Sequence, residues 1–259
     1  MTAGATLSDT LQILKRNVKR NFRIPQLLIF SSIQPIIFLL LFNYVFGGAV
    51  GGNKLGSVKY INDLLPGILA QTALFGAIQT GVGLAEDLNK GVIDRLRSLP
   101  IARSAVLTGR TLADTVRNLF VILLMGIVGT LLGFRATQPL LNVIAAGALV
   151  LIFAYSFSWI SACIGMLLKD AETVQVAGFL WVFPLVFASA VFVPIKTMPS
   201  WLQVFARNQP VTQVVTAVRH LTRGGIKNGN SYILHTLLWA FGILIVFVPI
   251  AVWRYKKIR

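Results

Sequence analysis

Six long apolar runs constrain this chain more than any other feature. A transmembrane helix needs about 20 largely apolar residues, and six runs approach or exceed that length. They cover residues 27–46, 64–84, 113–134, 140–168, 173–193 and 232–253. Only 12% of the 259 residues are charged, against roughly 25% in a globular protein, which excludes a soluble or disordered chain. We predict an all-α, polytopic membrane protein with six transmembrane helices.

The distribution of lysine and arginine predicts how the chain is oriented. With the N-terminus inside, 16 of the 24 Lys and Arg fall in the inner segments and eight in the outer ones. Positive charge gathers on the cytoplasmic side of membrane proteins, so we expect both termini in the cytoplasm. The net charge of +16 then faces the membrane surface, and no nucleic-acid partner is expected. The first run should stay as an anchor, because residues 1–26 are too long for an ordinary signal-peptide n-region.

Residues 1–26 are predicted to form a cytoplasmic amphipathic helix. Apolar residues recur at spacings of three and four, which places them on one helical face with lysine and arginine beside them. This face consists of Leu7, Leu11, Leu14, Val18 and Phe22. Such a helix lies in the headgroup layer of a membrane. A solvated basic tail is the alternative.

Segment 86–100, between the second and third runs, holds a dense set of charges. Asp94 lies about one helical turn from both Lys90 and Arg97, which allows ion pairs along a short helix, and Pro100 ends it. The apolar edge of this helix consists of Val92, Leu96 and Leu99. A short charged helix with one apolar edge suits docking into the groove of a partner. An ordinary charged loop is the alternative.

The outer connection, residues 194–231, contains two apolar patches. The first consists of Trp201, Leu202, Val204 and Phe205. The second follows Pro210 at helical spacing and ends at two glycines; it consists of Val211, Val214, Val215, Val218 and Leu221. We predict two short outer helices within residues 198–223 that dip into the outer leaflet. A lid packed on the outer surface is the alternative.

The sequence lacks the signatures of an energy source or a catalytic site of its own. It contains no G-x-x-x-x-G-K-[ST] loop. Cys163 has no histidine nearby, and His220 and His235 are far apart, so no catalytic or metal site is expected. The cores of the runs carry no carboxylate of the kind that ion-driven transporters use. Arg117 and Asn118 are assigned to the start of the third run, within reach of the headgroups.

Two stretches of the chain resemble one family of membrane proteins. Residues 90–105, KGVIDRLRSLPIARSA, are similar to the cytoplasmic motif of type-2 ABC transporter permeases, closest to the daunorubicin-resistance branch. The outer stretches MPSWLQ at 198–203 and NQP at 208–210, followed by AVR at 217–219, resemble the outer helices of the same family. The chain departs from the family pattern at Val92, where many relatives carry threonine. Residues 27–259 are interpreted as one transmembrane domain.

The resemblance implies a half-transporter in a bacterial plasma membrane, surrounded by lipid. Two membrane subunits, identical or closely paralogous, surround a central pathway. Two separate ATP-binding subunits dock beneath them and hold ATP and Mg, so this chain binds no cofactor and has no catalytic site. Segment 86–100 is then the coupling helix, and the N-terminal helix moves with it. The coupling residues implied are Glu86, Asp87, Gly91, Asp94, Arg95, Arg97 and Pro100.

The function implied is ATP-driven export of an amphiphilic drug or lipid-like molecule from the cytoplasm or inner leaflet. Candidate pathway residues are Gln34, Phe38 and Phe42 on the first run and Trp181, Phe183 and Phe187 on the fifth. Ordinary helix packing or lipid contact is the alternative for each. Export of a lipid-linked polysaccharide or envelope lipid would use the same architecture. The alternatives from other functional classes are a membrane scaffold, a membrane enzyme and a passive channel. No polar filter of the kind a channel needs is evident in the sequence.

Overall fold

The computed structural model describes residues 3–23, 25–46, 58–97 and 102–257, and nearly all of them are helical. In chain order the elements are α1 (Ala3–Arg23), α2 (Pro25–Leu41), η1 (Phe42–Phe46), α4 (Val58–Asn89), α5 (Val92–Arg97), α6 (Arg103–Leu131), α7 (Leu140–Leu168), α8 (Ala171–Phe187), η2 (Ile195–Thr197), α9 (Ser200–Asn208), α10 (Pro210–Arg223) and α11 (Gly229–Lys257). No strand forms within these ranges.

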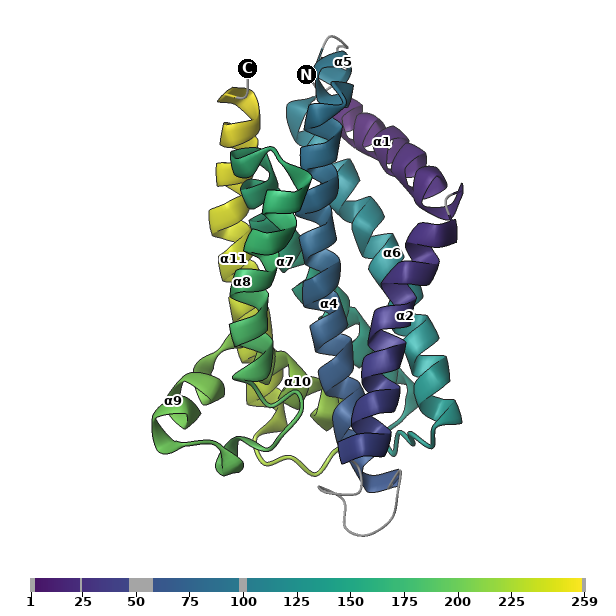
Figure 1. Cartoon of the computed structure of the whole chain (residues 1–259), viewed down its shortest axis with the longest axis vertical. Helices are drawn as coiled ribbons and strands as arrows, with labels where there is room; N and C mark the ends of the chain where they lie inside the picture. Colours follow the sequence, from purple (N-terminus) through teal and green to yellow (C-terminus); the bar gives the residue numbers. More distant parts are fainter. Residues whose placement is uncertain (1–2, 24, 47–57, 98–101, 258–259) are drawn as a thin grey trace.

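The long helices stand side by side in one bundle (Figure 1). Within the described residues, four segments are long and apolar enough to cross a membrane: Tyr60–Asn89, Ser104–Leu131, Leu140–Leu168 and Gly229–Lys257. Two shorter apolar helices, Ser31–Val45 and Ala171–Phe187, stand among them. The prediction of an all-α chain with several apolar helices is confirmed.

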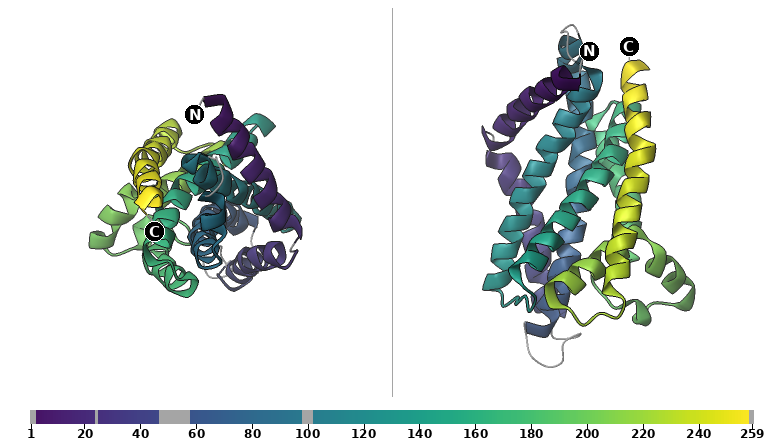
Figure 2. Two further views of the ribbon diagram at one scale, coloured as in Figure 1. Left: turned by 90° about the horizontal axis from the view of Figure 1, so that it is seen from above. Right: turned by 180° about the vertical axis from the view of Figure 1, so that it is seen from behind.

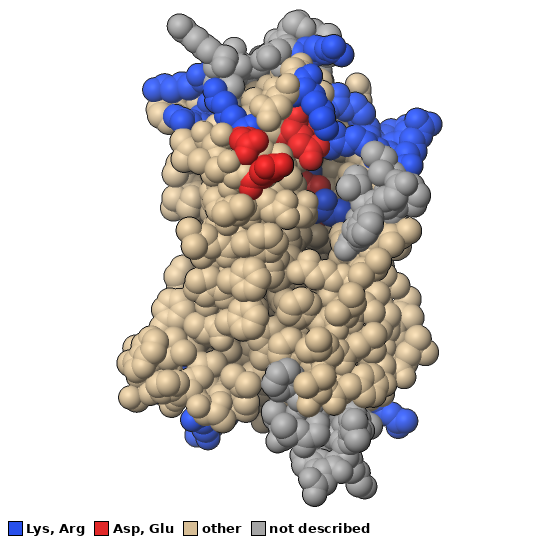
Figure 3. Space-filling model, viewed as in Figure 1, with Lys and Arg blue, Asp and Glu red and all other residues tan. Residues whose placement is uncertain are grey.

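The two ends of the bundle differ in their helices and in their charge. Both described chain ends lie at one end together with α1 and α5, whereas α9 and α10 lie at the other (Figures 1 and 2). We name the first the charged end and the second the opposite end. On the face shown in Figure 3, the acidic side chains and most basic ones gather at the charged end above a broad uncharged band. This division is that of a protein whose middle lies in hydrocarbon.

Helix α4 is the central element, since it contacts α2, α6, α7, α8 and α10. Its tightest contact is with α7, where Gly81 and Gly165 face each other. A Cβ atom on Gly81 would collide with the backbone oxygen of Ser161, and one on Gly165 would collide with the backbone oxygen of Gly81. Glycine at both positions therefore allows the two backbones to touch, as small residues do between membrane helices.

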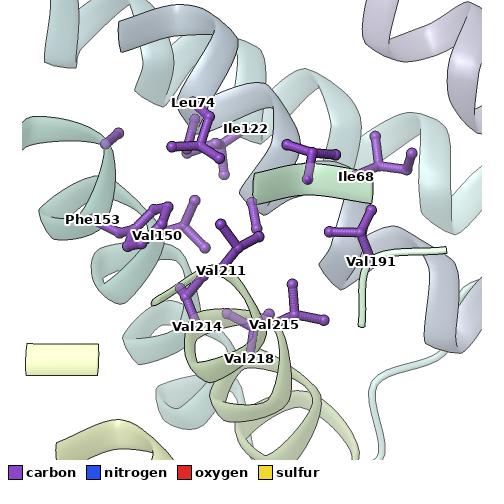
Figure 4. Close-up of a cluster of buried hydrophobic side chains, with 14 of the residues drawn as sticks. Ile68, Leu74, Ile122, Val150, Phe153, Val191, Val211, Val214, Val215 and Val218 are labelled. Atoms are coloured by element: carbon purple, nitrogen blue, oxygen red, sulfur yellow. The ribbon is translucent and has the colours of Figure 1, made fainter. Parts of the chain in front are cut away.

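Helix α10 packs against the bundle with its apolar face. Val211, Val214, Val215 and Val218 are fully or almost fully buried, and in Figure 4 they lie against Val150 and other core side chains of neighbouring helices. The bundle therefore buries the valine face that was expected to lie in lipid, and the depth of this helix in the outer leaflet stays a prediction.

An ionic contact also fixes α10 to the first turns of α4. Arg219 donates from Nε and Nη2 to the backbone oxygen of Asp63 at 3.0 and 2.6 Å, and Arg223 Nη1 lies 2.6 Å from Asp63 Oδ1. Desolvation lowers the pKa of the Arg219 guanidinium, and Asp63 opposes that shift. Arginine nevertheless keeps its charge, since its ordinary pKa is so high.

Helix α9 projects from the bundle and keeps its apolar patch exposed. Trp201, Val204 and Phe205 are all exposed, and the main contacts of α9 are with its neighbours η2 and α10. The helix predicted here is present. Its exposed apolar face suits insertion into the outer leaflet, as expected from the sequence. That insertion stays a prediction.

The ends of several apolar runs differ from the sequence prediction; the second extends to Val58–Asn89 and the sixth to Gly229–Lys257. The third run begins at Arg103, ten residues before the predicted start, because its first turns carry polar side chains that pair inside the bundle. The fifth run ends as a helix at Phe187, since Gln209 Nε2 donates to the backbone oxygens of Leu185 and Ala188 and satisfies that helix end. The fourth run has the predicted bounds.

Helix α1 is amphipathic, but its buried face differs from the predicted apolar one. It packs on α6 through Ile13, which lies against Gly109, whereas Leu7 and Leu11 are exposed. The inward face also carries the buried polar residues Thr10, Asn17 and Asn21. Helix α1 therefore presents leucine outward, as a helix in the headgroup layer does.

Replacing Gly165 with alanine tests the backbone contact between α4 and α7. We expect Gly165→Ala to lower the free energy of unfolding by about 1–3 kcal/mol, because the added methyl overpacks a closed contact. The measurement is the apparent melting temperature of the purified protein in neutral detergent. Gly147→Ala on the same helix is the control, since no atom lies within 4 Å of its added Cβ. Equal melting temperatures of the two variants would contradict this account.

Candidate functional site

A chain of charged side chains runs from the charged end into the bundle, and Asp87 on α4 is its first buried member. Asp87 Oδ1 accepts a hydrogen bond from Arg20 Nη1 on α1 at 3.0 Å, and Oδ2 accepts one from Arg110 Nη1 on α6. The Asp87 side chain is only 8% exposed. One carboxylate thereby joins α1, α4 and α6.

The chain continues along α6 through residues one turn apart. Arg110 Nε lies 3.6 Å from Asp114 Oδ2, and Arg117 Nη1 lies 3.4 Å from Asp114 Oδ1. Arg117 Nη2 also donates to the backbone oxygen of Gly76 at 3.0 Å. We name the series Arg20, Asp87, Arg110, Asp114 and Arg117 the ionic chain. Buried charges persist when each has an opposite neighbour, and here the signs alternate.

Two glycines on α4 make room for this face of α6. A Cβ on Gly83 would collide with Arg110, and one on Gly76 would collide with the side chain of Asn118. Gly76 and Gly83 are seven residues apart, and Arg110 and Asn118 are eight residues apart. Each separation is about two helical turns. The polar face of α6 therefore lies in a groove along α4 that glycine leaves open.

A pocket of about 190 Å³ lies where the ionic chain ends, among α2, α4, α6 and α8. Its polar lining includes Arg117, Asn118 and Gln71, and its apolar lining includes Phe75 and Phe179. Gln71 and Asn118 are each 3% exposed, and Gln71 Oε1 and Asn118 Nδ2 have no hydrogen-bond partner among the described residues. A buried amide without a partner costs free energy, so the pocket is suited to a polar ligand group.

Aromatic rings continue from the pocket toward the opposite end. Phe75 contacts Phe179 and Phe183 on α8, which carries Phe187 one turn further on; Phe192 then connects Phe187 to the α2–η1 side. We name the set the aromatic chain: Phe75, Phe179, Phe183, Phe187, Phe192, Phe42 and Phe38. Neighbouring ring centroids are 4.2 to 5.9 Å apart. These separations are those of interacting aromatic pairs.

The structure brings together five of the six candidate pathway residues. Gln34 lines the pocket, and the four phenylalanines named from the sequence (Phe38, Phe42, Phe183 and Phe187) belong to the aromatic chain. Trp181 does not, because its ring stacks on Phe157 of α7 at 5.8 Å. A helix such as α8 presents residues four apart on one face, and Trp181 lies on another.

The predicted coupling residues lie at the charged end, on the last turn of α4 and on α5. Glu86 Oε2 pairs with Lys90 Nζ at 2.9 Å, and Gly91, with a φ of 64°, makes the turn between the helices. Arg95 on α5 is exposed. Pro100 and the side chains of Asp94 and Arg97 lie outside the described residues. The sequence analysis allowed an ion pair between Lys90 and Asp94. In the structure the described partner of Lys90 is Glu86.

Helix α5 is held by its own bundle. Ile93 and Leu96 are buried in a cluster with Ile13 of α1, Leu107 of α6 and Tyr255 of α11. The apolar edge was expected to enter the groove of a partner; Leu96 instead packs internally, and the predicted Leu99 lies outside the described residues. Among the described side chains of α5, Arg95 is the one classed as exposed.

Sequence reasoning missed the inner part of the ionic chain. It assigned Arg117 to the headgroups, but Arg117 lies at the middle of α6 and turns inward to Gly76. It also gave Arg110 and Asp114 no role. The spacing of these three residues, four and three apart, puts them on one helical face. That periodicity was the available signal, although hydropathy alone assigns the segment to a loop.

The fold and the site define a helical membrane-type protein with an internal polar pocket and a charged end. Residues 8–222 match the family model of the ABC-2 type transporter. The chain belongs to this family, so the resemblance seen at residues 90–105 is confirmed. The permease function expected from that resemblance is confirmed as well.

Named relatives are similar over most of the chain. It is 34% identical over 254 residues to the daunorubicin resistance ABC transporter permease protein DrrB1 of Streptomyces coeruleorubidus, which covers 98% of this chain and 88% of that protein. It is 30% identical over 224 residues to the probable doxorubicin resistance ABC transporter permease protein DrrC of Mycobacterium tuberculosis, covering 86% and 79%. It is 25% identical over 222 residues to the putative transport permease ycf38 of Cyanophora paradoxa, covering 85% and 76%.

Substituting Asp87 tests whether it joins the three helices. We expect Asp87→Asn to lower the free energy of unfolding by about 1–3 kcal/mol, because Arg110 loses its hydrogen-bonded charge partner and keeps only the longer pair with Asp114. Thermal unfolding of the purified chain measures the effect. Glu86→Gln is the matched control, since its exposed pair with Lys90 contributes at most about 1 kcal/mol. Equal stability of the two variants would show that the contacts of Asp87 do not hold α1, α4 and α6 together.

Proposed function

We propose that this permease is the membrane half of an ATP-driven exporter whose substrate is an amphiphilic drug or lipid-like molecule. The observation that carries the proposal is the aromatic chain, which leads from a polar pocket to the opposite end along the exposed side of α8. Phe183 and Phe187 are 41% and 48% exposed, so planar apolar groups can stack there. The drug-resistance permeases among the relatives support the same substrate class.

The proposed topology has six spans, with the charged end in the cytoplasm. Four long helices cross the membrane, and α2 with η1 and α8 with the residues after it supply the other two crossings. The excess of lysine and arginine at the charged end supports this orientation. The exporter then stands in the bacterial plasma membrane with both termini inside.

The proposed energy source is a separate ATP-binding subunit, present in two copies, that holds ATP and Mg and docks at α5. Arg16, Arg20 and Arg95 line a groove between α1 and α5. A basic groove favours an acidic partner surface. This chain binds no cofactor in the proposal and has no catalytic residue.

The proposed pathway is completed by a second membrane subunit, either a second copy or a close paralogue. In one subunit the aromatic chain has exposed members, and a partner facing it would enclose the pathway between two such surfaces. Exposed aromatic residues are enriched at protein interfaces, which supports this placement.

The proposed mechanism passes force from α5 to the pocket. Closure of the ATP-binding subunits pushes α5, whose buried Ile93 and Leu96 transmit the movement to α1 and α6. The ionic chain extends from α1 to Arg117, so a shift of α1 changes the packing at the pocket. Rigid-body shifts of packed helices are a common form of such coupling. The substrate then leaves along the aromatic chain.

Export of a lipid-linked polysaccharide is the less favoured alternative. The pocket continues into phenylalanine side chains, which offer no hydrogen bonds to the hydroxyl groups of a sugar chain. Ion-driven transport is also less favoured, because Asp87 and Asp114 are paired with arginines.

Charge reversal on α5 tests the docking proposal. We expect Asp94→Lys and Arg97→Glu to reduce substrate-stimulated ATP hydrolysis at least about fivefold, the lower range of typical coupling free energies. The assay uses proteoliposomes containing the permease and the ATP-binding subunit that co-purifies with it. Lys169→Glu, at the exposed turn between α7 and α8, is the control for general loss of positive charge. Unchanged coupling in the α5 variants would reject this assignment.

Shortening Phe183 tests the pathway. We expect Phe183→Ala to reduce the accumulation of an amphiphilic drug in the same proteoliposomes about tenfold, because three ring contacts and a stacking surface are lost. Basal ATP hydrolysis should remain, since Phe183 lies away from α5. Phe241→Ala, an exposed phenylalanine on α11, is the control and should transport normally. An equal loss in both variants would indicate a general packing defect.

A further inference from the structure

Arg117 is the only charged side chain lining the pocket among the residues that the structure describes there. Its side chain is 12% exposed. It makes one hydrogen bond among the described residues, from Nη2 to the backbone oxygen of Gly76. Arg117 Nη1 also forms an ion pair with Asp114 Oδ1 at 3.4 Å. This distance is longer than the usual 2.7–3.2 Å of a hydrogen bond. Since arginine has five N–H donors, most of them lack an acceptor here.

The amides beside Arg117 are also incompletely bonded. Asn118 Nδ2 and Gln71 Oε1 are buried without a hydrogen-bond partner among the described residues. Oxygen and nitrogen of an amide exchange by a simple rotation of the group, so each side chain can present N–H to a ligand. Donors from three residues and two helices, α4 and α6, thus converge on one small space.

The charges around this space leave a positive excess. The ionic chain holds three arginines and two aspartates, and Asp114 is shared between Arg110 and Arg117. No carboxylate is among the described lining residues of the pocket. A buried guanidinium without full compensation is costly, and an oxyanion, which accepts two parallel N–H bonds from arginine, is its best partner.

The other walls indicate what is attached to that oxyanion. Phe75, Ile78, Val121 and Phe179 form the apolar lining, and the aromatic chain continues from two of them. A head group of carboxylate or phosphate size fits a volume of about 190 Å³, whereas a whole drug-sized ligand needs roughly 300 Å³ or more. The remainder of the molecule must therefore lie outside, along the phenylalanines.

We propose that the pocket binds the oxyanion head, carboxylate or phosphate, of an amphiphile through Arg117, Asn118 and Gln71, with its apolar body along the aromatic chain. This inference rests on the proposed function for its role in transport, since it narrows the substrate class. The binding itself depends only on the pocket. The oxyanion belongs either to a bilayer phospholipid or to a transported free amphiphile.

The test measures binding to the full-length permease in neutral detergent by native mass spectrometry. The probes share one alkyl chain: dodecyl phosphate, dodecanoate and dodecyltrimethylammonium. We expect one anionic probe bound per chain with at least about tenfold lower Kd than the cationic probe, as charge-assisted hydrogen bonds imply. Equal binding of the three probes, or preference for the cation, would overturn the proposal.

Variants identify the site. Arg117→Gln combined with Asp114→Asn removes both charges, so no carboxylate is left unpaired, and should weaken the anionic probes about tenfold or more. Gln71→Leu keeps the charge and should weaken them severalfold. Arg135→Gln, an exposed arginine beyond the end of α6, has the same charge as the Arg117→Gln single change and should bind normally. Undiminished binding in the folded double variant would refute the assignment.

Two further arms separate the sources of the oxyanion. The first arm adds inorganic phosphate as a competitor. If inorganic phosphate displaced dodecyl phosphate as effectively as dodecanoate does, the apolar body would add nothing to the affinity and the proposal would fall. Extraction of lipid from purified wild-type protein then decides between the sources. One phospholipid per chain, absent from the double variant, assigns a bilayer lipid; no phospholipid, with dodecanoate still bound, assigns a free amphiphile.

The binding test and the transport test fail independently. Binding is measured without an ATP-binding subunit, so its failure removes the oxyanion site and leaves the exporter proposal standing. Conversely, unchanged ATP hydrolysis in the α5 variants would remove the proposed coupling and leave the binding result intact.

Discussion

Close approach of other helices to the backbone of α4 underlies the bundle and its site. Gly81 brings α7 into backbone contact, and Gly76 and Gly83 open the groove that receives α6. In hydrocarbon, helices gain little from hydrophobic burial and associate through close packing and polar contacts. Because the groove is open, α6 can turn a charged face inward; without it, Arg110 and Asn118 would collide with α4.

The ionic chain connects the part of the protein that meets a partner with the part that meets a ligand. Asp87 joins three helices at the charged end, and Arg117 reaches the pocket four turns or so into α6. Alternating signs keep most of these charges neutralised, so the chain stabilises the packing while its last member retains unused donors. The same arginine thus belongs both to the structural network and to the pocket.

Particular residues show how far sequence reasoning reached. Phe38, Phe42, Phe183 and Phe187 were selected as aromatic residues on two apolar runs, and they do meet in one chain. Trp181 was selected by the same criterion and lies elsewhere, since residue type does not give rotation about a helix axis. A hydropathy profile averages over a window of residues and takes no account of ion pairs between side chains. The sequence prediction therefore made α6 too short and placed Arg117 at the membrane surface.

The sequence by itself determined the helical membrane class, the positions of most helices and the family. These follow from the length and composition of the apolar runs and from short motifs, which are local properties of the chain. The tertiary structure decided that α10 packs its valine face on the bundle, that Ile93 and Leu96 of α5 are buried internally, and that buried charges end at a polar pocket. Each of these depends on which surfaces meet across long separations in sequence, and only the packed bundle specifies that.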